Sequence, residues 1–193
     1  MYGTNDKVPF SEEDRTDQQV SLYAATKKAN EAMAHSYASV FGLPVTGLRF
    51  FTVYGPFGRP DMALFKFTDK ILKGEPIDVY NHGNLSRDFT YIDDIVDGLV
   101  GVIPQIPHKD PPYAIYNIGC GSPVSLDDFI QAIEQAAEKK ATRHNLPMQP
   151  GDVEKTWADT SNLQNLNGYK PKTHLEEGVR RFVDWYKIIS KNQ

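Results

Sequence analysis

The stretch SLYAATKKANEAMAHSYASVFG, residues 21 to 42, predicts one long amphipathic helix. Gly42 marks its end, because glycine readily takes the left-handed backbone conformation that closes many helices. Ala29, Met33, Tyr37 and Val40 recur at steps of three or four residues. This spacing predicts a buried stripe along one side of the helix.

Near its start, the predicted helix carries a tyrosine and a lysine that are suited to proton transfer. Tyr23 and Lys27 are one turn apart, so a phenol and an ammonium share one face. A nearby cation favours phenolate over phenol, and such a tyrosine can take a proton from an alcohol. The same spacing also arises by chance from a packed ring beside a solvated charge, so the pair alone is weak evidence.

The segment PVTGLRFFTVY, residues 44 to 54, is rich in β-branched and aromatic residues and predicts a buried strand of a parallel sheet. Glycines and prolines then break the chain into a loop that contains Arg59. Ligands of open α/β sheets bind beyond the carboxyl ends of the strands, where Thr52 and Arg59 would lie. Without further evidence, Arg59 is equally well interpreted as a surface arginine, and Phe51 as a core residue.

Caps and glycines divide the rest of the chain. Residues 4–19 are polar and predict a surface loop. The later expected elements are a helix capped by Asp61 and ended by Gly74, a strand over 76–80, a helix over 92–103, a strand over 113–121, a helix with a capping box at Ser125 and Asp128, and a closing helix with a capping box at Thr173 and Glu176.

Composition excludes several function classes. The formal net charge is -4 and no basic run is interleaved with aromatic residues, which argues against a nucleic-acid surface. Cys120 is the single cysteine, so the sequence has no disulfide framework and no thiolate zinc site. The histidines lack metal-ligand spacing, and the helical neighbours Asp93 and Asp94 point in different directions. We expect no metal site.

Two later stretches give the helix its context. They are GLRFFTVYGPFGRPDMALFKF, residues 47–67, and RDFTYIDDIVDG, residues 87–98. Together with the Tyr23 helix, and in this order, they resemble the extended short-chain dehydrogenase/reductase family, specifically its nucleotide-sugar epimerases. The resemblance is greatest to UDP-glucuronate 4-epimerase and covers nearly the whole chain.

The resemblance implies a C4 epimerisation that depends on NAD. Tyr23 would remove the proton of the sugar 4-hydroxyl while NAD takes the C4 hydride, and the hydride would later return to the opposite face. Lys27 would hold the nicotinamide ribose, and Phe51 would line the nicotinamide side. The cofactor carries the redox chemistry, and the protein supplies position and charge.

The same resemblance implies a set of substrate contacts. Thr52 and Arg59 would face the glucuronate carboxylate, Tyr80 the uracil, Arg87 the pyrophosphate, and Asp152 the ribose hydroxyls, while Gln149 replaces an arginine of related galactose epimerases. Taken alone, Tyr80 is more often interpreted as a core tyrosine, Asp152 is equally well interpreted as a turn aspartate, and Asp88 could be a structural partner of Arg87.

The expected fold class is α/β: the C-terminal part of a Rossmann-type parallel sheet and a smaller α/β substrate-binding domain. Residues 1–60 would end the NAD-binding domain. Residues 61–193 would mainly bind the nucleotide sugar, with strand 113–120 returning to the Rossmann sheet.

The family's glycine-rich G-x-x-G-x-x-G turn is not in this sequence. Met1-Tyr2-Gly3 resembles the end of the family's Ser-Ser-Val-Tyr-Gly segment, which places the catalytic serine or threonine before Met1. We therefore expect the C-terminal part of a cytoplasmic enzyme, inactive alone. Its expected partners are a UDP-sugar, an N-terminal Rossmann half and, through the Tyr23 helix, a second copy of the enzyme.

Other interpretations stay open. The parent could be a UDP-glucuronate decarboxylase or a nucleotide-sugar dehydratase. The chain could also be a non-catalytic UDP-binding module that uses Arg87 and Asp152, or a structural fragment that binds neither UDP nor NAD.

Overall fold

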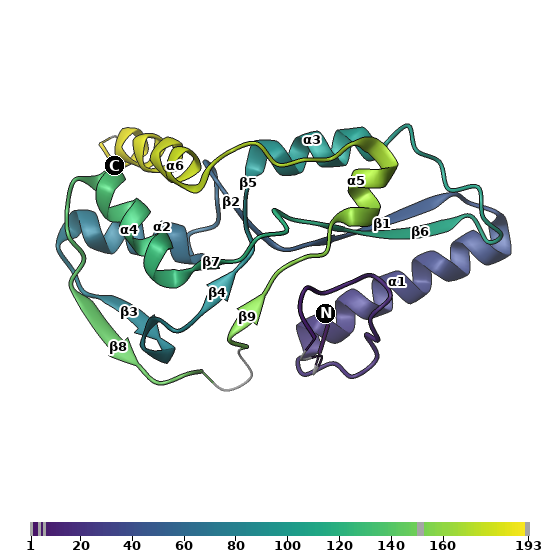
Figure 1. Ribbon diagram of the computed structural model, residues 1–193, viewed down its shortest axis with the longest axis horizontal. Coiled ribbons are helices and arrows are strands. Elements are labelled where there is room, and N and C mark those ends of the chain that lie inside the picture. The colour runs from purple at the N-terminus through teal and green to yellow at the C-terminus, as the bar shows by residue number, and fades with distance from the viewer. Residues whose placement is uncertain (1, 4, 6, 150–152, 192–193) are drawn as a thin grey trace.

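The computed structural model describes residues 2, 3, 5, 7–149 and 153–191. At its centre, strands β1 (Val45–Phe50) and β6 (Tyr113–Ile118) pair in parallel. Helix α1 (Leu22–Phe41) lies below this pair in Figure 1, and α3 (Ile92–Val102) lies above it beside α5 (Ser161–Asn167). The result is a parallel sheet covered by helices on both faces, the arrangement expected of the α/β class.

Helix α1 begins and ends as the sequence predicts. The Ser21 hydroxyl accepts a hydrogen bond from the Ala24 N–H at 3.1 Å, and Gly42 takes the left-handed conformation with a φ of 61°. Because α1 and β1 are antiparallel neighbours in the chain, the first turns of α1 lie near the carboxyl end of β1 (Figure 1).

The predicted stripe on this helix is not buried against the sheet of the same chain. Met33, Tyr37 and Val40 are 56%, 57% and 68% exposed, and Ala29 is also exposed. The buried residues of α1 are instead Ala24 and Ala38, whose small side chains allow the helix to approach the sheet closely. Periodicity identifies an apolar face, but it does not say what covers that face.

The predicted strand over residues 44–54 is two strands. At Phe51 the chain leaves its neighbour β6, and β2 (Thr52–Tyr54) pairs in parallel with β5 (Phe89–Tyr91). The Phe51 N–H still donates to the Ile118 carbonyl at 3.1 Å, whereas the Thr52 N–H donates to the Asp88 carbonyl at 3.0 Å. The apolar run is continuous, so only the change of partner reveals the break.

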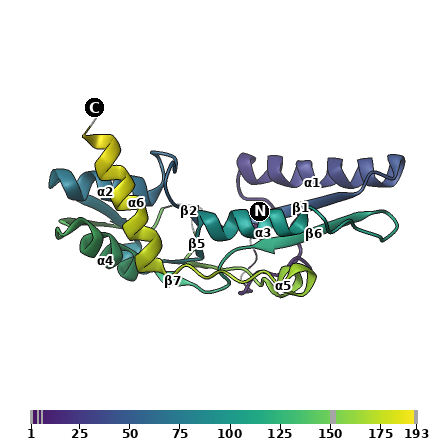
Figure 2. The same cartoon turned by 90° about the horizontal axis from the view of Figure 1, so that it is seen from above.

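A second group of elements lies at the other end of the molecule (Figure 2). Helices α2 (Ala63–Lys73), α4 (Leu126–Ala137) and α6 (Leu175–Ser190) pack together over the parallel pair β3 (Ile77–Tyr80) and β8 (Arg143–Leu146). The short strands β7 (Val124–Ser125), β4 (Ser86–Arg87) and β9 (Lys155–Thr156) form a small sheet, and a 3-10 turn, η1 (Asn81–Gly83), follows β3.

Aromatic rings fill the core of this second group. Phe89 and Phe129 are stacked with their centroids 3.9 Å apart, and Phe182 is fully buried in the same cluster. A buried phenylalanine contributes about 2–3 kcal/mol of transfer free energy, so these rings dominate the local stability. They also form the inner wall of the pocket described below.

Of the predicted caps, one is confirmed and two are wrong. Ser125 caps α4, because its hydroxyl accepts from the Asp128 N–H at 3.0 Å. Helix α2 begins after Met62 without a side-chain cap, and the Asp61 carboxylate binds Arg59 instead. Helix α6 begins after His174, and the Thr173 N–H donates to the buried Asp94.

The segment before α1 is more than a surface loop, contrary to expectation. Tyr2, Phe10 and Thr16 are buried, and Phe10 forms a parallel bridge with Ala158. The apolar residues of an otherwise polar segment therefore attach it to the body of the protein. None of the helices in the described part of the chain is long and apolar enough to span a bilayer.

Candidate active site

A pocket of about 340 Å³ opens where β1 gives way to β2. It brings together three residues that the sequence singled out: Phe51, Thr52 and Arg59. The other lining residues are mostly apolar and come from β2, the loop after it, α2, β5, α4 and α6: Val53, Tyr54, Gly55, Gly58, Met62, Ala63, Leu64, Phe65, Phe89, Phe129 and Phe182. An apolar pocket with a few polar groups at its edge is typical of a small-molecule site.

Tyr23 and Lys27 lie on the exposed side of α1, near the carboxyl end of β1. Tyr23 is 71% exposed, and the Lys27 Nζ lies over its ring, 5.4 Å from the centroid. The phenol is therefore open to a ligand and is not sealed in the interior. The ammonium contacts the face of the ring, a cation–π arrangement that keeps the two groups together.

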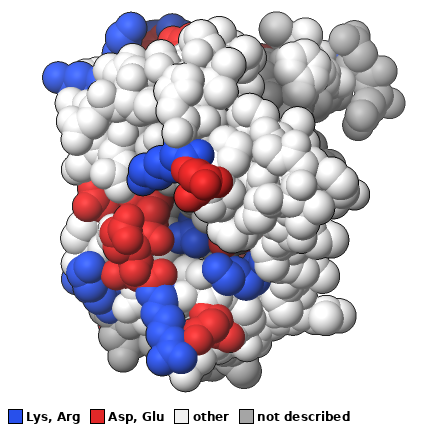
Figure 3. All heavy atoms as spheres, turned by 90° about the vertical axis from the view of Figure 1, so that its right-hand side faces the viewer, with Lys and Arg blue, Asp and Glu red and all other residues white. Residues whose placement is uncertain are grey.

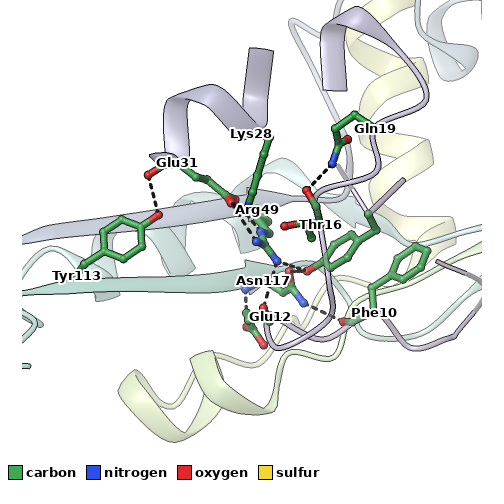
Figure 4. Close-up of polar contacts among 10 residues, drawn as sticks. Phe10, Glu12, Thr16, Gln19, Lys28, Glu31, Arg49, Tyr113 and Asn117 are labelled. Carbon is green, nitrogen blue, oxygen red and sulfur yellow. Dashed lines mark hydrogen bonds and ion pairs between the residues drawn. The ribbon is translucent and has the colours of Figure 1, made fainter. Parts of the chain in front are cut away.

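A buried ion pair fixes how α1 sits on the sheet (Figure 4). On β1, Arg49 donates from Nε to Glu31 Oε1 at 2.7 Å and from Nη2 to Glu31 Oε2 at 3.0 Å. The Nη1 of the same guanidinium donates to the Tyr2 hydroxyl at 3.1 Å. One arginine thus joins the helix that carries Tyr23 to the segment that precedes it. A bidentate pair fixes direction as well as distance.

Asn117 on β6 completes this network. Its side-chain amide donates to the Phe10 carbonyl at 2.8 Å and to the Asp159 carbonyl at 3.2 Å, and its Oδ1 accepts a hydrogen bond from the Tyr2 hydroxyl. Its backbone N–H donates to Glu12 at 2.6 Å. Burial is the largest influence on Tyr2 and raises the pKa of its phenol, so Tyr2 holds these segments together as a neutral group.

Arg59 stands at the rim of the pocket in a two-point contact with Asp61. Its Nε donates to Asp61 Oδ1 at 2.9 Å, and its Nη2 donates to Oδ2 at 2.5 Å. These hydrogen bonds are the main reason that the pKa of Arg59 is raised, and the charge of Asp61 adds to the effect. The guanidinium at the rim of the pocket is therefore paired with a carboxylate of its own loop.

Arg87 lies on β4, and Asp88 is not its partner. The Arg87 Nη1 donates to the carbonyls of Ser86 at 3.0 Å and Glu154 at 3.1 Å. The buried Asp88 carboxylate instead accepts the backbone N–H groups of Cys120, Gly121 and Ala158 at 2.7–3.0 Å. The Asp88 carbonyl binds the Thr52 N–H, so Arg87 is one residue from a direct contact with the wall of the pocket.

The remaining predicted substrate contacts are not among the residues that line the pocket. Tyr80 is half-buried at the end of β3, and Gln149 is exposed after β8. Neither lines the pocket, and Asp152 lies outside the described residues. Among the residues that the structure describes, no group of three His, Cys, Asp or Glu side chains could hold a metal ion.

Sequence reasoning missed two parts of this site. The first is the aromatic wall, which Phe65, Phe129 and Phe182 supply from three helices. The apolar faces of these helices predict a core, but no local pattern says that the core has an opening. The second is the Arg49–Glu31 pair, for which an arginine inside an apolar strand was the available signal.

Residues 1–119 match the NAD dependent epimerase/dehydratase family. The chain therefore belongs to the NAD dependent epimerase/dehydratase family. Among the curated relatives, it is 49% identical over 201 residues to the probable UDP-glucuronate 4-epimerase of Rhizobium meliloti, covering 96% of this chain and 59% of the relative. It is 50% identical over 199 residues to UDP-glucuronate 4-epimerase 1 of Arabidopsis thaliana, covering 96% of this chain and 46% of the relative.

Solved structures also match this chain over nearly its whole length. The UDP-glucuronic acid 4-epimerase of Bacillus cereus, in complex with UDP-glucuronic acid and NAD, matches with a TM-score of 0.88 at 34% identity, over 97% of this chain and 59% of that one. The UDP-glucose 4-epimerase of Thermotoga maritima, with UDP-glucose, matches with a TM-score of 0.89 at 27% identity, over 98% and 60%. The chain spans between 46 and 61% of the length of the curated relatives that it matches.

Proposed function

We propose that this chain is the sugar-nucleotide-binding part of a UDP-glucuronate 4-epimerase, together with the helix that carries the catalytic base. The observation that carries the proposal is the exposed Tyr23 phenol beside Lys27 at the start of α1, near the carboxyl end of β1, where an apolar pocket lined by Arg59 opens. The names of the relatives support the choice of UDP-glucuronate.

The residues present suit one end of NAD. A phenol and an ammonium on one exposed helix face match a nicotinamide ribose, whereas the sequence has no glycine-rich turn for the pyrophosphate. Bound NAD supplies the acceptor and donor of the C4 hydride. Tyr23 accepts the 4-hydroxyl proton and returns it after the ring has turned over. Lys27 orients the ribose, and Phe51 lines the nicotinamide side.

The substrate contacts follow from charge and position. A planar guanidinium can bind a carboxylate through two parallel hydrogen bonds, which suits Arg59 to the C6 carboxylate of a hexuronate. Thr52, in the same pocket wall, supplies a hydroxyl beside it. Arg87 would bind the pyrophosphate by the same bidentate geometry. Tyr80, Gln149 and Asp152 complete the proposed nucleotide contacts.

A glycine-rich NAD-binding half completes the enzyme in this proposal. Strand β1 pairs with β6 on one side, and no strand among the described residues pairs with its other edge. An open strand edge readily accepts another strand. A second chain or an upstream segment would add its parallel strands there. We assign the complete enzyme to the cytoplasm, in keeping with the single cysteine of this chain.

The outer face of α1 supports a homodimer. Met33, Tyr37, Val40 and Phe41 form an apolar surface on a helix whose other face already covers the sheet. In the end view of Figure 3, the charged side chains lie over the left half and the centre, and the described residues on the right are almost all uncharged. Pairing of α1 with its symmetry mate would remove this apolar surface from water.

A chimera tests the proposal. The upstream part of the Rhizobium meliloti relative, joined ahead of this chain, should convert UDP-glucuronate to its C4 epimer, as measured by chromatography of the sugar nucleotides. Tyr23→Phe should abolish turnover and leave UDP binding intact. The chain alone should show no turnover. A chimera that binds UDP-glucuronate and NAD but keeps full activity with Tyr23→Phe would refute the role of Tyr23.

A further inference from the structure

Arg59 is the only charged side chain among the described residues that line the pocket. If it is to bind a carboxylate on the sugar, its guanidinium must be available. In the structure it is engaged, because Nε and Nη2 both donate to the Asp61 carboxylate. This is the side-on edge of the guanidinium, one of the two edges that can receive a carboxylate in bidentate fashion.

The loop holds the two residues close together at the rim. The Met62 N–H donates to the Arg59 carbonyl at 3.1 Å, which closes a turn over residues 59–62. Asp61 does not cap α2, since this helix begins after Met62 without a side-chain cap. Its carboxylate can therefore accept hydrogen bonds from Arg59. The Arg59 and Asp61 side chains are 74% and 58% exposed, so solvent and ligands can reach both.

A hexuronate carboxylate and the Asp61 carboxylate have the same charge and the same two-oxygen geometry. Exchange of one for the other conserves the charge balance of the guanidinium. The free energy needed to break the Arg59–Asp61 pair is also modest, because an ion pair this exposed is weakened by water and salt. A neutral hexose, with a hydroxymethyl group in place of the carboxylate, has nothing to offer in exchange.

We propose that Asp61 is an exchangeable internal carboxylate that occupies Arg59 while the pocket is empty and is displaced by the carboxylate of a hexuronate substrate. This inference rests on the proposed function and extends it by one residue. Asp61 competes with the acidic sugar, so it weakens the binding of substrate and product alike. It also keeps a neutralised arginine at the mouth of the empty pocket.

Two measurements on the full chain test the exchange directly. First, carbon-13 NMR of labelled aspartate follows the pKa of Asp61. Its hydrogen bonds to Arg59 are the main cause that lowers this pKa in the free chain. Saturation with UDP-glucuronate should return the pKa to its ordinary value, whereas UDP-glucose and UDP should leave it low.

Second, calorimetry compares Asp61→Asn with wild type. The ratio of the affinity for UDP-glucuronate to the affinity for UDP-glucose should be about two- to fivefold higher in the variant than in wild type, the range that fits an exposed ion pair. Asp17→Asn is the matched control, because Arg15 and Asp17 form an exposed pair at the same spacing outside this pocket. It should leave the ratio unchanged.

The outcomes separate the inference from the function on which it rests. If UDP-glucuronate binds while the pKa of Asp61 stays low, the carboxylate binds elsewhere or on the other guanidinium edge, and the exchange is refuted while the proposed function stands. An unchanged affinity ratio in Asp61→Asn refutes it equally. If neither UDP nor UDP-glucuronate binds the chain, the inference and the proposed function are both wrong.

Discussion

Arg49 and Glu31 form a bidentate ion pair between the sheet and α1, and their side chains are only 6% and 11% exposed. The same guanidinium binds Tyr2, so a single group aligns α1 with the segment that leads into it. Every part of the proposed chemistry that depends on Tyr23 therefore depends on this pair to orient the helix.

Glu31→Gln should lower the free energy of unfolding by about 3 kcal/mol, because it leaves a buried guanidinium without a counter-charge. Urea unfolding monitored by circular dichroism gives the value. Glu177→Gln is the control, since Glu177 pairs with Arg180 and Arg181 at the exposed surface of α6. The free energy of unfolding of this variant should equal that of wild type within experimental scatter. Equal losses in the two variants would show that Arg49 gains nothing from Glu31.

The same pair makes stability depend on pH. Burial alone would raise the pKa of Glu31, but the hydrogen bonds and charge of Arg49, and then of Lys28, outweigh it and hold the pKa below its ordinary value. The folded state therefore binds this proton less readily than the unfolded state. Its stabilisation is complete above the unfolded pKa of about 4.3 and disappears as pH falls through the folded value. Unfolding titrations between pH 3 and 7 should show a smaller pH dependence in Glu31→Gln than in wild type.

The two ends of the site differ in how far sequence could predict them. Tyr23 and Lys27 are fixed by one helix, and local spacing alone places them side by side. Arg59 lies in a glycine–proline loop after a strand, and this loop is also predicted by a local pattern. What surrounds Arg59 is not local, because the aromatic wall depends on how three helices pack against β5.

Asp61 illustrates the limit of pattern reading. An aspartate before an apolar run predicts a helix cap, yet the helix begins one residue later and the carboxylate binds Arg59. Capping and ion pairing use the same oxygens, so the choice between them depends on where a nearby cation lies. The apolar stripe of α1 shows the same limit, since its spacing does not distinguish a sheet from a second copy of the helix.

Asp88→Asn should destabilise the protein by about 3 kcal/mol. The two carboxylate oxygens accept three backbone N–H groups and the Thr90 hydroxyl, and an amide nitrogen would oppose some of those donors inside the protein. Thermal unfolding measures the loss. Asp93→Asn, at an exposed position on α3, should leave the melting temperature near that of wild type. A small effect at Asp88 would mean that the surrounding turns can rearrange.

Tyr37→Glu should prevent dimer formation by the completed enzyme, because it places a charge in the middle of the exposed apolar face of α1. Sedimentation velocity of the chimera distinguishes monomer from dimer. Ile103→Glu is the control, since Ile103 is also an exposed apolar residue and lies just beyond α3, on the opposite side of the sheet from α1. A Tyr37→Glu protein that remains dimeric would place the interface elsewhere.

Gly178→Ala should destabilise the protein by about 1–2 kcal/mol, even though alanine is the better helix former. Alanine in place of a helical glycine gains about 1 kcal/mol. At this position in α6, however, a Cβ atom would come within 2.8 Å of Tyr91 and 2.9 Å of a ring carbon of Tyr54, and overpacking costs about 1–3 kcal/mol. Gly101→Ala on α3 is the matched control, because there the new methyl group meets the end of the Asn167 side chain, which can move aside. Urea unfolding should therefore show opposite signs for the two substitutions. A gain in stability at both positions would mean that α6 can shift away from the pocket wall that Tyr54 forms.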